Sequence, residues 1–355
     1  MTRPHYAFRQ KRNHIFAASF DFFGRLLVGR HSELGAEPKT ILIVRLDHIG
    51  DVLNATGIPQ SLKGHYPRAK IIFLTSAAGA ALIQNNPYID EVIVYEAKWF
   101  RRGSAGKERS LEKLASELRL KKIDLALGLR GDLRENYLVW RAGAGYSVGY
   151  GITGGGFFLS RELTYRWDAH EIQHSLDILR AIGIRRDHLL PSLYLSDEEI
   201  LRSQKLRSEW GGRTVGIQLD AGSSRKFWPE LARKQFLEQA LRDFPSLKFV
   251  FLGQDARTKE WLGDRIKNAP KALNLMGDGA DIRELLVRVR ACDYFIGSDS
   301  GPSHIAAAFG LTALVLYNDN NDFERWKPLA ENAEALRKPQ DAVQILRWLR
   351  ERTRV

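Results

Sequence analysis

The sequence is poor in cysteine and has no long apolar run. Cys292 is the only cysteine in 355 residues, so an internal disulfide is excluded and nothing in the chain requires an oxidising compartment. No stretch of about eighteen consecutive apolar residues occurs, which predicts that no helix spans a membrane. Neither an Asp-x-Asp pattern nor a cysteine pair is present. We therefore expect no bound metal ion and no cofactor.

Two nucleotide-binding fingerprints are also missing. No Gly-x-Gly-x-x-Gly follows the first predicted strand, and no Gly-x-x-x-x-Gly-Lys-Ser/Thr occurs anywhere in the chain. These absences count against a dinucleotide-dependent oxidoreductase and against a P-loop enzyme.

Positive charge, in contrast, is abundant and localised. The formal net charge is +12. Residues 1–40 carry seven Lys or Arg against three acids, net +4, and residues 98–122 carry nine against three, net +6. A localised excess of this kind favours a polyanionic partner, which is nucleic acid, an anionic membrane or a phosphorylated substrate.

Residues 1–39 are predicted to form a basic, amphipathic extension. One face of the predicted helix carries Phe16, Phe20, Phe23 and Leu27. Asp21 interrupts the apolar run along the sequence. Such a helix either lies on a membrane surface or packs on the protein, and the sequence leaves both interpretations open.

From Thr40 onward, apolar strands alternate with helices. Strands are predicted at 41–46, 71–74, 92–95 and 123–127, and again at 214–219, 248–252, 294–297 and 313–317. The glycine-rich stretch 143–156 is expected to turn tightly or to be mobile, and the polar stretch 185–212 is the expected linker region. Two successive series of this kind predict an α/β fold with two doubly wound domains that face each other across a cleft.

The stretch 294–310 is the strongest candidate for an anion site. An apolar strand ends there at small residues, Ser300 and Gly301 among them, and an Ala-rich helix follows with Pro302 at its expected first position. A helix start presents free N–H groups and a partial positive charge, which suit a phosphate. The stretch also fits an ordinary strand–turn–helix. Asp299 could accept hydrogen bonds from sugar hydroxyls, and His304 fits a structural hydrogen bond better than a ligand role.

A second candidate is the loop after the strand at 214–219. Ser223, Ser224 and Lys226 follow that buried strand, and this composition suits a diphosphate as well as a solvated surface loop. Polar groups at 253–255 could hold a ribose, and the apolar pair Leu275 and Met276 could flank a base.

The turn 47–51 offers a candidate base. Gly50 permits close approach of a ligand to the backbone, and Asp51 stands at a helix start. Asp51 is either a capping residue or a catalytic base facing the cleft. Because a helix start lowers the pKa of a carboxylate, we expect Asp51 to be ionised and able to accept a proton.

Taken together, these segments resemble glycosyltransferase family nine, the ADP-heptose:lipopolysaccharide heptosyltransferases. The resemblance extends over roughly 40–350 and is carried by the segments 41–52, 86–92, 226–229 and 297–304, with a weaker match at Arg325, Trp326 and Pro328. Asp220 departs from the pattern, since the family often has proline there. The glutamate expected to contact the ribose also has no clear counterpart.

The resemblance implies a GT-B fold with two Rossmann-like domains, the first binding acceptor and the second binding nucleotide sugar. It implies Asp51 as the general base, and it assigns the diphosphate to Lys226 and the N–H groups of Ser300 and Gly301. Asp299 would bind the donor sugar, and Met276 would lie near the adenine. The reaction would be inverting and metal-independent. The domains expected are 1–39, 40–190, 191–335 and a C-terminal helix, 336–355, for which packing back on the first domain is one option.

The implied partners are ADP-heptose or a similar nucleotide sugar and an anionic lipopolysaccharide-type acceptor, which Arg101, Arg102 and Lys107 would meet. We expect a cytoplasmic enzyme, with peripheral contact to the inner membrane as an open alternative, and no nucleic acid as a partner. Two other interpretations are weighed: a nucleotide-sugar epimerase of similar fold, and a nucleic-acid-binding protein suggested by charge alone.

Overall fold

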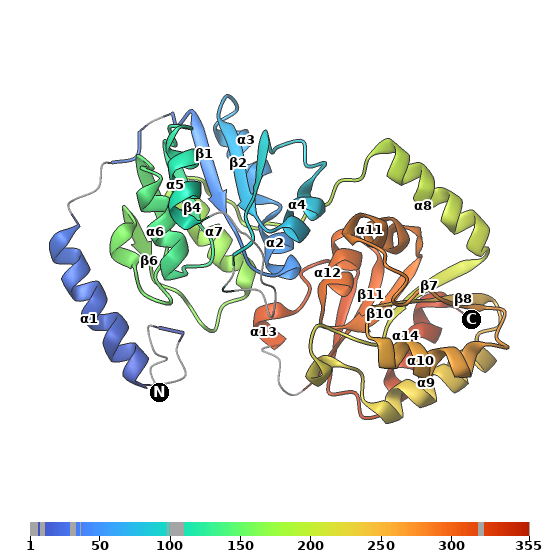
Figure 1. Cartoon of the computed structure of the whole chain (residues 1–355). Coiled ribbons are helices and arrows are strands. Elements are labelled where there is room, and N and C mark those ends of the chain that lie inside the picture. The colour runs from blue at the N-terminus through green and yellow to red at the C-terminus, as the bar shows by residue number, and fades with distance from the viewer. Residues whose placement is uncertain are drawn as a thin grey trace. The chain divides into compact units, whose positions relative to one another are not determined.

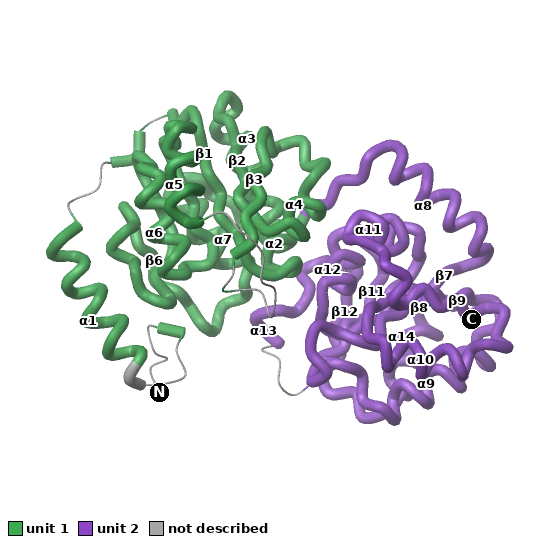
Figure 2. Tube along the Cα trace, in the orientation of Figure 1, with its two compact units in different colours: residues 1–191 green, residues 192–355 purple. Residues whose placement is uncertain are grey.

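The chain folds into two compact units, residues 1–191 and 192–355 (Figure 2). This computed structural model describes residues 6–7, 11–28, 33–35, 37–97, 99, 110–318 and 323–354. No helix in these described ranges has both the length and the apolar character needed to cross a membrane.

The first unit is built on a six-stranded parallel sheet with the order β3-β2-β1-β4-β5-β6 (Figure 1). Its strands are β1 (Thr40–Val44), β2 (Lys70–Thr75), β3 (Glu91–Val94), β4 (Leu125–Gly128), β5 (Tyr146–Tyr150) and β6 (Arg161–Leu163). Its helices are α1 (Lys11–Leu27), α2 (Ile49–Ala55), α3 (Ile58–His65), α4 (Ala77–Ile83), α5 (Leu111–Arg119), α6 (Leu133–Arg141), the short η1 (Gly156–Phe158) and α7 (Glu171–Ala181). Residues 41–44 of β1 are fully buried, as expected of a central strand covered on both faces.

The second unit repeats this plan with the order β12-β11-β10-β7-β8-β9. Its strands are β7 (Arg213–Gln218), β8 (Leu247–Leu252), β9 (Ala272–Asn274), β10 (Tyr294–Ser298), β11 (Thr312–Tyr317) and β12 (Ala333–Arg337). Its helices are α8 (Asp197–Trp210), the short η2 (Ser224–Lys226), α9 (Glu230–Asp243), α10 (Ala256–Ile266), α11 (Ile282–Ala291), α12 (Gly301–Ala308), α13 (Phe323–Trp326) and α14 (Val343–Thr353).

The shared strand order places one switch point in each sheet. Counted along the chain, both sheets have the order 3-2-1-4-5-6, so the winding reverses between β1 and β4 and between β7 and β10. In sheets of this kind, ligands bind outside the carboxyl ends of the strands at that reversal. The turns that follow these four strands are therefore the places to look for a site.

Two segments differ from what the sequence predicts. The glycine-rich stretch 143–156 contains a buried strand, β5. Glycine is needed at position 149, because a Cβ there would stand 2.6 Å from the backbone oxygen of Gly128 on β4. A strand that demands glycine for close packing resembles a loop in sequence. Helix α8 lies within the expected linker, and its Ser196–Glu199 capping box fixes its first turn.

The first and last helices, α1 and α14, each pack on one unit. Helix α1 packs on the first unit through Ala17, Asp21 and Gly24, while the predicted face with Phe16, Phe23 and Leu27 is exposed. The helix therefore packs on the protein, as one of the two interpretations has it, but of the predicted aromatic face it is Phe20 that contacts the domain, through Phe157. Helix α14 gives Ile345, Leu346, Trp348 and Leu349 to the core of the second unit, and its packing on the first domain stays a prediction.

Replacing Gly149 with alanine should destabilise the first unit. The new Cβ would overlap the Gly128 oxygen of the neighbouring strand, and such overpacking costs about 1–3 kcal/mol. Urea unfolding curves of Gly149→Ala measure this cost. Gly35→Ala is the control, because nothing lies within 4 Å of a Cβ at that position. Equal stability of the two variants would contradict the close approach of β4 and β5.

Candidate active site

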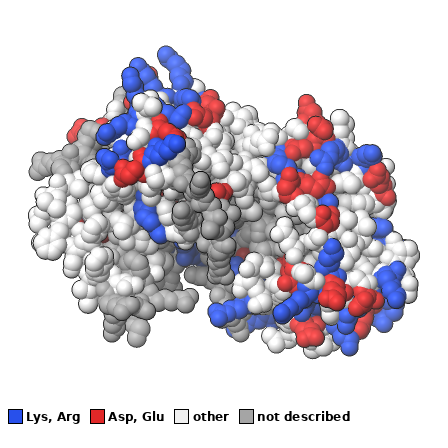
Figure 3. Space-filling view, viewed as in Figure 1, with Lys and Arg blue, Asp and Glu red and all other residues white. Residues whose placement is uncertain are grey.

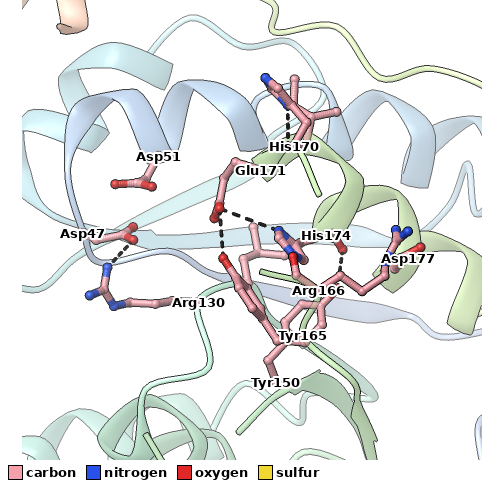
Figure 4. A network of polar contacts seen from close by, with 12 residues as sticks. Asp47, Asp51, Arg130, Tyr150, Tyr165, Arg166, His170, Glu171, His174 and Asp177 are labelled. Carbon is pink, nitrogen blue, oxygen red and sulfur yellow. Dashed lines mark hydrogen bonds and ion pairs between the residues drawn. The ribbon is translucent and has the colours of Figure 1, made fainter. Parts of the chain in front are cut away.

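A cluster of buried charges lies at the carboxyl edge of the first sheet, at its switch point (Figure 4). Asp47 and Asp51 come from the turn between β1 and α2, Arg130 follows β4, and Glu171 begins α7. Arg130 Nη1 donates to Asp47 Oδ2 at 2.7 Å. The Asp47 side chain is wholly buried, whereas 11% of the Asp51 side chain is exposed, so within this aspartate pair Asp51 is the carboxylate that a substrate can reach.

Arg45, the residue after β1, holds these carboxylates together. Its Nη2 donates to Asp51 Oδ1 at 2.7 Å and to Glu171 Oε1 at 3.1 Å. Its Nε lies 2.7 Å from Asp47 Oδ1, and its Nη1 donates to the Leu129 carbonyl at 3.0 Å. A buried guanidinium is tolerated only when it is paired in this way. Asp51 is therefore fixed in position by a cation beneath it.

The pKa of Asp51 is raised to about 7, which is the opposite of the expected direction. Burial is the largest cause, Asp47 and Glu171 add negative charge, and Arg45 and Arg130 offset part of the shift. The prediction of a lowered pKa was wrong because it considered the helix start alone, without the burial and the neighbouring acids. A carboxyl group with this pKa is a stronger base than an ordinary aspartate and is still half ionised near neutral pH.

Glu135 is a further buried acid near this cluster. Its side chain is fully buried on α6, and neither carboxyl oxygen has a hydrogen-bond partner. Burial, together with the charges of Asp47 and Asp132, raises its pKa well above the ordinary value. Nothing in the sequence marks it, because a glutamate in the first turn of a helix usually faces solvent.

The segment 170–174 reads His-Glu-x-x-His, a spacing typical of zinc-binding helices. Here the side chains serve other purposes. His170 Nδ1 accepts from the Ile172 N–H as the cap of α7, and the His174 ring stacks on Tyr165, whose hydroxyl donates to Glu171 Oε2 at 3.0 Å. Among the described residues, no three His, Cys, Asp or Glu side chains are arranged to hold a metal ion.

Several members of this cluster escaped the sequence prediction. Arg45 was read as part of an apolar run, although a charged residue within a buried strand signals a buried partner. Glu171 lies 126 positions away from Arg45 in the sequence. No spacing rule links two residues so far apart, and only the sheet order brings α7 to this edge.

The switch point of the second sheet carries the predicted anion site. Helix α12 follows β10 directly, with Ser300 as the N-cap, Gly301 first and Pro302 second, one position later than expected. Ser303 Oγ donates to the Ser298 carbonyl at 2.7 Å, and a Cβ on Gly297 would stand 2.4 Å from that hydroxyl. These small residues let the helix start close against the strand, with its first N–H groups directed outward.

Lys226, Asp299 and His304 meet at this helix start. Lys226 Nζ donates to Asp299 Oδ2 at 2.7 Å and to the Asp299 carbonyl at 3.3 Å, and His304 Nε2 lies 3.1 Å from Asp299 Oδ1. Burial alone would raise the pKa of Asp299, but the hydrogen bonds and charges of His304 and Lys226 outweigh it and keep that pKa lowered. The structure thus brings together three of the predicted residues, and it gives His304 the structural hydrogen bond expected of it.

Asp220, the departure from the family pattern, is hydrogen-bonded to the turn after β8 and, through Oδ1, to the Gln218 side chain. Its Oδ2 accepts from the backbone N–H groups of Gln254 and Asp255, each at 2.7 Å. The φ of Gly253 is +148°, and a Cβ there would overlap Asp220. Asp220 therefore fixes the turn after β8.

The other predicted site residues are two serines on a loop, one methionine in the core and three cations within residues 98–122. Ser223 and Ser224 are exposed on the loop that enters η2, next to Lys226. Met276 is 1% exposed and belongs to the hydrophobic core of the second unit. Arg101, Arg102 and Lys107 lie outside the described residues.

Solved structures confirm the two-domain fold. The glycosyl transferase of family 9 from Veillonella parvula superimposes with a TM-score of 0.73 at 21% identity, covering 92% of this chain and 91% of that one. The ADP-heptose lipopolysaccharide heptosyltransferase II of E. coli gives 0.73 at 20% identity, covering 88% and 98%. The fold is the GT-B type, with two Rossmann-like domains.

Sequence comparison gives the family. The family model described as glycosyltransferase family 9 (heptosyltransferase) matches residues 111–347. A curated relative, the lipopolysaccharide core heptosyltransferase OpsX of Haemophilus influenzae, is 20% identical over 290 residues, covering 80% of each chain. The chain belongs to glycosyltransferase family 9, and it is a glycosyltransferase.

Removing the charge of Glu171 should lower the pKa of Asp51. Glu171 raises that pKa by its negative charge, and without it Arg45 is shared among fewer carboxylates. Carbon-13 NMR titration of the carboxyl groups in Glu171→Gln measures the shift, with the Asp51 signal assigned by its loss in Asp51→Asn. Asp177→Asn is the matched control on the same helix, since Asp177 pairs with Arg166 and Arg180 instead. An unchanged Asp51 titration in Glu171→Gln would contradict the network.

Proposed function

We propose that this glycosyltransferase moves a heptose, or a similar sugar, from ADP-heptose or a related nucleotide sugar to the inner core of lipopolysaccharide. The observation that carries the proposal is the Asp51 carboxyl, held by Arg45 at the switch point of the first sheet with a pKa of about 7. The names of relatives support the substrates: one is a lipopolysaccharide core heptosyltransferase, and a solved E. coli heptosyltransferase holds ADP.

The reaction proposed is a single displacement with inversion. Asp51 takes the proton of an acceptor hydroxyl while that oxygen forms a bond to the anomeric carbon of the donor. The bond between the anomeric carbon and the diphosphate oxygen breaks at the same time, and ADP leaves with the electron pair. The products are the glycosylated acceptor, ADP and one proton, which Asp51 returns to solvent.

The leaving diphosphate gains negative charge as its bond breaks, and we assign its stabilisation to the second unit. The first N–H groups of α12 have no partner within the helix, and Lys226 pairs with Asp299 beside the helix start. A lysine ammonium has three donor hydrogens, and Asp299 accepts two of them. The third is directed to the diphosphate in this proposal. Preorganised donors of this kind do the work that a metal ion does in other transferases.

The acceptor and its location complete the proposal. The net charge of +6 over residues 98–122 suits the phosphates and carboxylates of a lipopolysaccharide core, and we assign contact with them to Arg101, Arg102 and Lys107. Because such an acceptor carries a lipid anchor, the enzyme acts in the cytoplasm at the inner face of the inner membrane.

Asp51→Asn should reduce kcat by roughly 10²-fold or more, since the amide cannot accept the proton. In the wild-type enzyme, kcat/KM should fall as the pH drops through about 7, where Asp51 becomes protonated. Transfer assays across a pH series, with isothermal titration of ADP as the control for folding and donor binding, measure both effects. Near-normal turnover by Asp51→Asn would remove it as the base, and donor conversion without acceptor would favour an epimerase.

Lys226→Ala should weaken ADP binding and lower turnover together, because the lost cation serves both the ground state and the leaving group. Titration calorimetry with ADP and a transfer assay measure the two effects. Lys205→Ala, which removes an exposed lysine from α8 in the same unit, is the charge-matched control. If ADP binds Lys226→Ala as tightly as it binds Lys205→Ala, then Lys226 does not hold the diphosphate.

A further inference from the structure

Helix α1 exposes an unusually apolar face. Six of its large side chains are each at least 61% exposed: Ile15, Phe16, Phe22, Phe23, Leu26 and Leu27. At 3.6 residues per turn they cover an arc of about 140° around the helix. Figure 3 shows the surface over α1 as largely uncharged, whereas charged side chains crowd the surface over α5. Apolar patches of this extent on a folded protein mark an interaction surface.

The opposite face holds α1 to the first unit. Asp21 is buried there, and it accepts from the Tyr6 hydroxyl at 2.9 Å and from the Gly155 N–H at 2.7 Å. Gly24 lies so close to the Phe157 ring that a Cβ would overlap it. The helix is therefore fixed with its apolar side turned away from the domain.

The charges of α1 divide in the same way. Asp21 is the only acidic residue in the helix, and it faces the domain. The remaining charged residues, Lys11, Arg12 and Arg25, are all cationic. Arg25 is largely exposed and also reaches Glu162. Among the described side chains of α1, the exposed face therefore combines apolar groups with the cation of Arg25, and the one acid of the helix is buried against the domain, which complements an anionic surface.

The helix is mounted at the edge of the sheet that carries Asp51. It packs on Gly155 and Phe157, in the loop after β5, and that loop contacts the turn after β4. Thr153 N donates to the Gly131 carbonyl at 3.3 Å, and Leu133 N donates to Thr153 Oγ1 at 2.8 Å. Gly131 adjoins Arg130, which pairs with Asp47.

We propose that the exposed face of α1 is a membrane-contact surface, on which the first unit lies against an anionic lipid bilayer. The six apolar side chains enter the interface between headgroups and acyl chains, and Arg25 meets the lipid phosphates. This inference does not depend on the identity of the sugar or of the acceptor, because binding to lipid needs neither.

Two other occupants fit the face less well. A second copy of the chain would bring two helices of the same positive charge together, which is unfavourable. A protein partner would have to offer a groove around a convex helix whose exposed arc is about 140° wide. A bilayer accepts a helix of this shape without a matching groove.

The test is co-sedimentation of the full-length protein with vesicles. We expect binding to phosphatidylcholine vesicles that contain phosphatidylglycerol, weaker binding to phosphatidylcholine alone, and a loss on adding salt. The double variant Phe23→Ser and Leu26→Ser should bind at least about tenfold more weakly, since it removes two apolar side chains that enter the bilayer in this proposal. The matched control, Leu120→Ser and Leu201→Ser, removes two exposed leucines elsewhere and should bind as the wild type does.

Circular dichroism melting and ADP titration establish that both double variants are folded. Equal vesicle binding by the wild type and the α1 variant would overturn the proposal. So would a wild-type dimer in light scattering without lipid that becomes monomeric in the α1 variant, because a second copy would then cover the face. Vesicle binding with no sugar transfer would instead leave this proposal standing and count against the reaction proposed above.

Discussion

The pairing of the buried Arg45 guanidinium with carboxylates is the interaction on which the first unit depends. Moving such a charge out of water costs several kcal/mol, and only well-placed partners offset that cost. Asp47, Asp51 and Glu171 are those partners. Because each carboxylate also needs the cation, the positions of all four side chains are determined together. The carboxyl group of Asp51, the base that we propose, is consequently in place before any substrate arrives.

The strand order explains why the proposed site residues come from a few turns at the carboxyl ends of the strands. In both sheets the winding reverses beside the first strand of the unit, which leaves room for a ligand at the carboxyl ends. Asp51 follows β1 and Arg130 follows β4, while Lys226 follows β7 and Asp299 follows β10. All four strands that flank the two switch points thus contribute. The short turns keep these side chains close to rigid elements, as precise chemistry requires.

The sequence predicts the parts of this arrangement that depend on local pattern. The strand at β1, the helix start at Ser300 and the family signatures are all local, and the fold follows from their order. What it misses depends on distance and burial. Glu171 contacts Arg45 only once the sheet is assembled. Strand β5 looks like a loop in sequence, because the close approach of β4 requires a glycine in it. The pKa of Asp51 shifts in the opposite direction to the one predicted, because the position at a helix start does not show that the side chain is buried.

The two candidate sites, one on each unit, differ in local charge, and this difference suits the proposed reaction. Around Arg45 and Arg130 lie the carboxyl groups of Asp47, Asp51 and Glu171, and burial together with the charges of Asp47 and Glu171 keeps the pKa of Asp51 raised. The second unit offers Lys226 and a helix start, which favour an anion. A lysine set beside Asp51 would lower its pKa and weaken it as a base. Carrying the base and the anion site on different units lets each keep the potential that its task requires.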